Sequence, residues 1–146
     1  MRSFPGKMIL LGTCLLPGLL PGVQPLREQW RTACAALSAG EPARALEGFR
    51  EFEHWYGQEP RVREPAFREL QLRLWGLAAL QAGAPREAAG ILESWLAEFP
   101  DQEAFRSFIR FQLLGLYGVL GEEEKQARAR KAFLDDYPEL PEASLV

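Results

Sequence analysis

Histidine and cysteine are scarce in this chain of 146 residues, in which His54 is the one histidine and Cys14 and Cys34 are the two cysteines. A structural zinc site takes about four thiolate or imidazole ligands. His54 has only Glu51 and Glu53 near it in the sequence, which falls short of such a set. We therefore expect no metal site and interpret His54 as a surface residue.

Catalytic motifs are also lacking. The serines stand in no nucleophile motif and have no base spaced to activate them; they are Ser3, Ser38, Ser94, Ser107 and Ser144. No glycine-rich loop is followed by Lys and Ser or Thr, as a phosphate-binding loop requires. The acidic run 122–124 opens a predicted helix, where the helix dipole favours negative charge. The sequence therefore predicts a protein that is not an enzyme and uses no cofactor.

An excess of basic residues is missing as well, since 17 Lys and Arg stand against 20 Asp and Glu. Proteins that bind nucleic acid usually carry a clear basic excess. The arginine-rich stretch 61–73 contains Glu64 and Glu69, each four residues before an arginine, which is ordinary pairing on a helix surface. We expect Glu64 to pair with Arg68 and Glu69 with Arg73. An RNA-binding helical array is therefore a disfavoured alternative, and no nucleic acid partner is expected.

No apolar run is long enough to span a membrane, which takes about 20 residues. The run 8–20 is shorter and is interrupted by Gly12 and Pro17. Residues 1–24 combine a short basic start, this run and turn-forming residues, which is the order of a secretory signal peptide. We therefore predict export with removal of 1–24 and no stable membrane span. A signal anchor and a misassigned start codon are the alternatives.

Cys14 lies in "LGTC", which loosely resembles the lipobox of bacterial lipoproteins. Thr13 is unusual before the acylated cysteine, and "LLPGLLPG" follows in place of a polar tether. Lipidation at Cys14 is therefore disfavoured. If Cys14 is removed with the signal peptide, Cys34 has no partner for an intrachain disulfide. Its alanine-rich surroundings indicate a small buried side chain.

Helical periodicity covers the rest of the chain. Apolar residues recur at i, i+4, i+7 and i+11, proline opens several segments and glycine follows their ends. The expected helices fill 26–39, 42–56, 65–81, 85–98, 102–120 and 122–136. No segment shows sustained alternation of apolar and polar residues, so the fold class is all-α.

The helix pairs repeat one another. The first copy matches the second at a shift of 43 residues, with Gly40, Ala45, Phe52, Tyr56 and Gly57 corresponding to Gly83, Ala88, Trp95, Phe99 and Pro100. The second matches the third at a shift of 38, with Gly121, Phe133, Tyr137 and Pro138 in the third copy. Helical hairpins that repeat at this scale predict an α-α solenoid. The hairpins are expected at about 25–57, 64–100 and 101–138.

The middle copy resembles the tetratricopeptide repeat family. It carries "LWG" at 74–76 for the family's Leu-Gly pair, Gly83 at the turn, Ala88 in the second helix and Pro100 after it. Gly76 and Ala88 are expected to meet where the helices cross, and Gly83 to adopt the left-handed conformation that closes the hairpin. The sequence departs from the family at Gln126, which replaces the small residue of the third copy, and in spacings longer than the usual 34 or so.

The tails "WLAEFPDQEAF" and "FLDDYPELPEA" look most like a long-hairpin subgroup of bacterial envelope proteins, which includes outer-membrane assembly factors and Tol-Pal-associated periplasmic proteins. The resemblance spans residues 25–141. It implies a non-enzymatic scaffold in the periplasm or cell envelope that binds another protein or a peptide. A structural spacer within a larger repeat protein is the alternative.

In the family the first helix of each hairpin lines a concave groove. Carried over at the two shifts, this implies a partner-binding surface of Arg27, Trp30, Leu37, Leu70, Arg73, Leu77, Phe108 and Phe111. An apolar floor with two arginines suits a peptide that offers bulky apolar side chains and a carboxylate. Arg73→Glu is accordingly expected to weaken binding and to leave stability nearly unchanged. The alternative is that Trp30, Leu77 and Phe108 pack between hairpins.

The chain's last residues, 139–146, are expected to begin a further repeat or to form a C-terminal stub. Helix 122–136 presents Ala129, Phe133 and Tyr137 on one face, and little sequence follows to cover them. An uncovered apolar stripe favours association. The sequence therefore predicts self-association through this last helix.

Overall fold

The structure is a computed structural model that describes residues 22–146, so the predicted signal peptide, apart from residues 22–24, and Cys14 lie outside the described residues. Within the described part, every regular element is helical, which confirms the all-α class. The elements are α1 (Leu26–Ser38), α2 (Pro42–Tyr56), α3 (Pro60–Arg63), α4 (Pro65–Gln81), α5 (Pro85–Glu98), α6 (Glu103–Leu120), α7 (Glu123–Asp136) and a final 3-10 helix, η2 (Pro141–Leu145).

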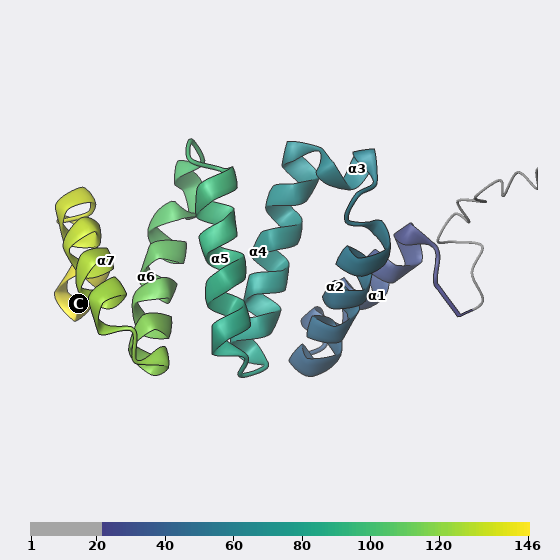
Figure 1. Cartoon of the computed structure of the whole chain (residues 1–146), viewed down its shortest axis with the longest axis horizontal. Helices are drawn as coiled ribbons and strands as arrows, with labels where there is room; N and C mark the ends of the chain where they lie inside the picture. The colour runs from purple at the N-terminus through teal and green to yellow at the C-terminus, as the bar shows by residue number, and fades with distance from the viewer. Residues whose placement is uncertain (1–21) are drawn as a thin grey trace, which may run out of the picture.

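The long helices form antiparallel hairpins that stand in one row (Figure 1). Helix α1 packs against α2, α4 against α5, and α6 against α7, while α2 meets α4 and α5 meets α6 at the two junctions between hairpins. Each hairpin thus contacts only its neighbours in the row, as in other helical-repeat folds.

The three hairpin turns have the same geometry. Gly40, Gly83 and Gly121 have φ values of +73°, +72° and +70°, a left-handed conformation that favours glycine. In each turn the N–H after the glycine donates to a carbonyl five residues earlier, at 2.9 Å in all three: Glu41 to Ala36, Ala84 to Ala79 and Glu122 to Tyr117. The prediction for Gly83 is confirmed, and the sequence repeat corresponds to a repeated backbone structure.

The matched aromatic positions are buried near the end of the second helix of each hairpin. Phe52, Trp95 and Phe133 all have exposed fractions of 0%. Each lies against the aromatic ring one turn later, with ring centroids 5.7 Å apart for Phe52 and Tyr56, 6.0 Å for Trp95 and Phe99, and 5.2 Å for Phe133 and Tyr137. Burying one such side chain stabilises the fold by roughly 1.5–3 kcal/mol.

Small residues allow close packing within the second and third hairpins. A Cβ on Gly76 would lie 2.7 Å from Cδ2 of Leu92, so the α4 backbone approaches α5 closely at this point, and Ala88 on α5 is fully buried. In the third hairpin the larger Gln126 is accommodated by Gly118, on which a Cβ would lie 2.7 Å from Nε2 of Gln126. That amide nitrogen donates to the carbonyl of Leu114 at 3.2 Å.

Helix α3 is an element that the periodicity does not predict. It lies between the first two hairpins and places Val62, which is 1% exposed, against Phe52 and Tyr56. The second junction has only the short segment 99–102 between its helices. The insertion at α3 therefore explains why the first two turn glycines are further apart than the second two.

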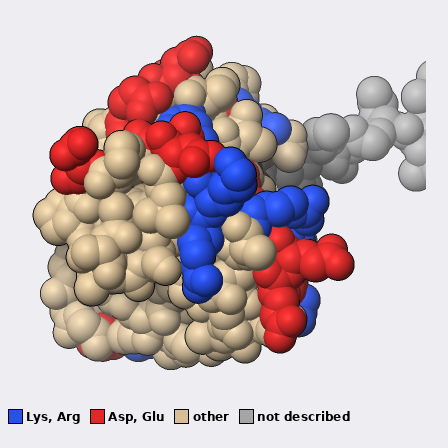
Figure 2. Space-filling view, turned by 90° about the vertical axis from the view of Figure 1, so that its left-hand side faces the viewer, with Lys and Arg blue, Asp and Glu red and all other residues tan. Residues whose placement is uncertain are grey.

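The apolar stripe of Ala129, Phe133 and Tyr137 on α7 is covered at its centre. Phe133 is fully buried and lies 6.0 Å from the ring of Phe111, and Leu140 shares a small crevice with both. Figure 2 faces this end of the row and shows basic and acidic side chains together beside an uncharged area. The stripe is therefore covered at Phe133, while Ala129 and Tyr137 are half-buried, and self-association through α7 stays a prediction.

Candidate functional site

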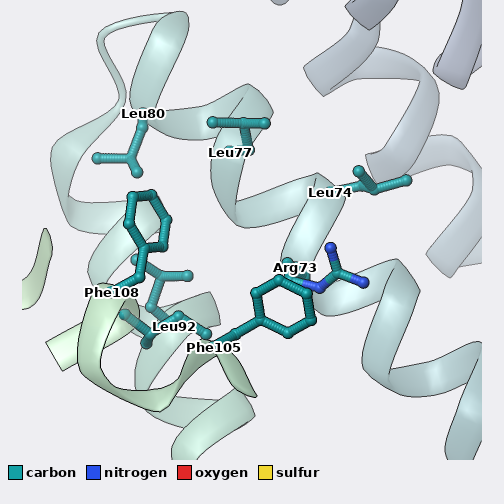
Figure 3. A pocket seen from close by; sticks show the side chains of 8 residues that line it. Arg73, Leu74, Leu77, Leu80, Leu92, Phe105 and Phe108 are labelled. Atoms are coloured by element: carbon teal, nitrogen blue, oxygen red, sulfur yellow. The ribbon is translucent and has the colours of Figure 1, made fainter.

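An apolar pocket of about 340 Å³ lies between α4 and α6 (Figure 3). It is lined by Arg73, Leu74, Leu77, Leu80, Leu92, Phe105, Phe108 and Ile109. Leu92 and Ile109 are buried at 3% and 1% exposure and connect the pocket to the main core. Its size and apolar lining are typical of sites that bind small molecules or partner side chains.

Two phenylalanines on α6 line the pocket and remain accessible to solvent. Phe108 is 52% exposed and Phe105 is 37% exposed, both large values for an aromatic side chain. Leu77 of α4 lies across the pocket from Phe108 in Figure 3. An apolar pocket bordered by exposed aromatic rings marks a surface that a partner can cover.

Arg73 is the one polar residue among those that line the pocket, and its charge is already paired. Its Nε donates to Oε1 of Glu69 at 2.8 Å, and its Nη2 lies 3.3 Å from Oε2 of the same carboxylate. The guanidinium carbon lies 3.9 Å from the ring centroid of Phe105, a cation-π geometry. Glu69 also accepts a hydrogen bond from Nε1 of Trp95 at 3.0 Å. Arg73 therefore supports the pocket wall.

A second cleft, of about 580 Å³, lies among α1, α3 and α4. Its lining consists of Pro25, Leu26, Arg27, Trp30, Arg61, Val62, Glu64 and Phe67. The ring of Trp30 lies 4.7 Å from that of Phe67 and 5.3 Å from that of Phe52, so it both packs inside the fold and faces the cleft. This cleft combines an apolar floor with charged side chains of both signs.

The eight residues predicted for the partner surface are distributed over several places. Arg73, Leu77 and Phe108 meet in the pocket between α4 and α6. Arg27 and Trp30 line the cleft beside α3.

The other three lie elsewhere. Phe111 borders the C-terminal crevice, Leu37 packs against the main core, and Leu70 is half-buried on α4. The prediction missed Phe105, although it stands three residues before Phe108 on the same helix face and could have been found by that spacing.

Groups with shifted pKa values lie outside both recesses. A hydrogen bond from Arg50 holds the pKa of Glu87 below its ordinary value, and burial with a nearby Glu93 raises the pKa of Tyr117. Burial also raises the pKa of the half-buried Cys34 thiol. Since Glu87 and Tyr117 join neighbouring hairpins, their shifts have a structural cause.

Comparison with known proteins finds no match. The chain matches no protein-family model, no curated protein and no solved structure. No cluster of three or more His, Cys, Asp or Glu side chains suited to a metal ion occurs within residues 22–146. None of the helices in that range is both long and apolar enough to cross a bilayer. The two recesses are therefore the features of the molecule that point to a function.

Proposed function

We propose that this chain is a non-enzymatic scaffold that binds a segment of another protein in the pocket between α4 and α6. The observation that carries the proposal is Phe108, whose ring is half exposed at an apolar pocket. The resemblance of residues 25–141 to tetratricopeptide repeats supports a protein partner. The signal-like order of residues 1–24 supports export, and the subgroup resemblance supports the bacterial periplasm or cell envelope.

The pocket favours a partner that supplies an apolar side chain. Five aliphatic side chains and two phenylalanines line it, and covering their exposed surface would contribute about 25 cal/mol per Å² of apolar area removed from water. Because Glu69 already pairs with Arg73, a partner carboxylate is not required at this point. Leucine, phenylalanine or tryptophan is therefore the residue type that we expect to enter the pocket.

Arg73→Glu is a poor test of this surface. The substitution would place a second carboxylate beside Glu69, whose side chain is only 14% exposed, and would remove the cation over Phe105. Repulsion between the two carboxylates and the lost ring contact would destabilise the fold. The sequence-based expectation of unchanged stability is therefore replaced by a predicted loss.

Phe108→Asp is the sharper test. Peptides would be selected from a display library on the immobilised full chain, and their affinities for the chain and its variants measured by calorimetry. We expect Phe108→Asp to weaken a selected peptide at least tenfold, about 1.4 kcal/mol. Val119→Asp is the matched control, because Val119 lies on the same helix, is 75% exposed and does not line the pocket.

Two outcomes would contradict the proposal. One is that selected peptides bind Phe108→Asp and the Val119→Asp control equally well. The other is that repeated selection yields no binding peptide, which would favour the structural spacer as the role of this array.

A further inference from the structure

Among residues 22–146, two arginines in the cleft beside α3 have no acidic partner. Arg27 on α1 and Arg61 on α3 are exposed and line the same cleft. Within residues 22–146, neither guanidinium has a carboxylate within 4.0 Å. Arg50, Arg68 and Arg73, in contrast, each lie within that distance of a glutamate. The charge of Arg27 and Arg61 is therefore available to a ligand.

The charge balance of the cleft favours an anion. Glu64 also lines it but pairs with neither arginine, so two cations and one anion leave an excess of one positive charge. The planar guanidinium group pairs with carboxylates through two parallel hydrogen bonds. An anion that enters would be attracted by both arginines.

The floor of the cleft is apolar. Trp30 and Phe67 are half-buried with ring centroids 4.7 Å apart, and Val62 and Leu26 complete the surface. Apolar walls lower the local dielectric and strengthen charge interactions near them. A ligand that carries a carboxylate close to an aromatic or aliphatic group would match both features.

We propose that the cleft among α1, α3 and α4 binds an acidic, apolar segment of the partner protein, with a carboxylate held by Arg27 and Arg61 and an apolar side chain on Trp30 and Phe67. This inference depends on the proposed function, because it assigns chemistry to a second part of the same partner. It moves the carboxylate-binding role from Arg73 to a place where the cations are unpaired. Helix α3, which has no counterpart at the junction of α5 with α6, supplies Arg61.

The test uses two small probes that differ only in charge at one end: N-acetyl-phenylalanine, which has a carboxylate, and N-acetyl-phenylalaninamide, which does not. Each is titrated into the full chain, and the indole N–H signal of Trp30 is followed by NMR after assignment with Trp30→Phe. We expect the acid to shift this signal and to bind at least tenfold more tightly than the amide.

The variants locate the carboxylate. Arg27→Gln combined with Arg61→Gln should reduce the affinity for the acid to that for the amide, with an unchanged Tm because both side chains are exposed. Arg31→Gln is the matched control: Arg31 is one turn after Arg27 on α1, is also exposed, and lines a different recess. It should bind the acid as the unmodified chain does.

Results other than those expected would overturn the inference. Equal affinity for acid and amide would remove the role of the arginines, and an unmoved Trp30 signal with both probes would remove the cleft as a binding site. Failure here is distinguishable from failure of the proposed function, which is measured at Phe108 with selected peptides. Peptides that depend on Phe108 but not on Arg27 and Arg61 would leave the scaffold function intact and refute the cleft.

Discussion

The two junctions between hairpins use equivalent positions for different chemistry. At the first junction, where α2 meets α4, Glu53 accepts hydrogen bonds from Nε2 of Gln71 at 2.7 Å and from Nη1 of Arg68 at 2.9 Å. At the second junction, where α5 meets α6, the repeat places Leu96 at the position of Glu53 and Ile109 at that of Gln71. At these two positions, a partly buried polar pair at one junction is thus replaced by an apolar pair at the other.

The same residue type finds different partners at the two junctions. Arg68 and Arg106 occupy equivalent positions on α4 and α6, with side chains 11% and 12% exposed. Arg68 pairs with Glu53, whereas Arg106 donates from Nη2 to the carbonyl of Phe99 at 3.0 Å. The side chain of Leu96 cannot accept a hydrogen bond, and Arg106 is paired instead with this backbone carbonyl and with Glu103 on its own helix, 3.5 Å away.

The repeat therefore sets the shape of each hairpin but not the chemistry between hairpins. A buried polar network stabilises only the arrangement in which every member finds its partner, and an apolar contact tolerates small shifts. We therefore infer that the first junction is the more specific of the two and the more sensitive to single substitutions.

Glu53→Ala should have the largest effect. It leaves the amide of Gln71, which is 0% exposed, without its acceptor and removes one carboxylate from Arg68. An unsatisfied buried donor costs about 1–3 kcal/mol and a charged one more, so we expect a loss of about 3 kcal/mol in the free energy of unfolding.

Glu47→Ala is its control on the same helix, because Glu47 is 62% exposed and, within residues 22–146, forms an ion pair with Arg50 alone. An exposed pair of this kind contributes about 0.5 kcal/mol or less. Urea unfolding of the two variants measures the difference. Similar losses for both would show that the network at the first junction contributes little.

Tyr117→Phe tests the second junction and should have an intermediate effect. The hydroxyl of Tyr117 on α6 donates to Oε1 of Glu93 on α5 at 2.7 Å. Its removal should cost about 1–2 kcal/mol, since the acceptor is a carboxylate. Tyr137→Phe is the control, because Tyr137 is half-buried and its hydroxyl makes no hydrogen bond among the described residues.

At alkaline pH, Tyr117→Phe should also differ from the unmodified chain in how its stability depends on pH. Burial, with Glu93 nearby, holds the pKa of Tyr117 above its ordinary value of about 10. The unfolded chain therefore releases its proton first, and stability is present below pH 10 and is lost as the pH rises above it. Tyr117→Phe should show a flatter loss of Tm between pH 9 and about 11 than the unmodified chain. Equal slopes would contradict the role of this phenol.

Local sequence signals predicted the helices and turns well. Proline at helix starts, glycine in the turns and the spacing of Phe52, Trp95 and Phe133 depend on the residues within one hairpin, so they can be read without knowing its neighbours. Helix α3 was missed because its four residues are too few to show a period. The left-handed conformation at the turns was predictable because glycine adopts it without the steric cost that a Cβ brings.

Contacts between hairpins were harder to predict. Glu69 does pair with Arg73 as its spacing predicts, but Arg68 pairs with Glu53 and Glu98 in place of Glu64. These partners lie far along the chain, on α2 and α5, and no local pattern indicates them. The candidate site could therefore be predicted only in part. The repeat register predicts Phe108 at the binding surface. The pairing of Arg73 with Glu69, in contrast, conflicts with the carboxylate-binding role that the same register predicts for Arg73.

The smallest expected effect concerns a second link across the first junction, the pair of Arg50 on α2 with Glu87 on α5. Glu87 also accepts a hydrogen bond from Nε1 of Trp75 at 3.2 Å. The hydrogen bond from Arg50 is the main reason that the pKa of Glu87 lies below its ordinary value of about 4.5.

A lowered pKa means that this link stabilises the fold above pH 4.5 and that its contribution is lost as the pH falls through the pKa of the folded state. Arg50 is 45% exposed, so water screens the pair and we expect Glu87→Gln to cost less than about 1 kcal/mol at pH 7. The difference in Tm between the variant and the unmodified chain should then shrink between pH 6 and about pH 3. Because Tyr117 titrates only at the opposite end of the scale, a Glu87→Gln protein that keeps its full Tm deficit at pH 3 would show that charge pairing does not join α2 to α5.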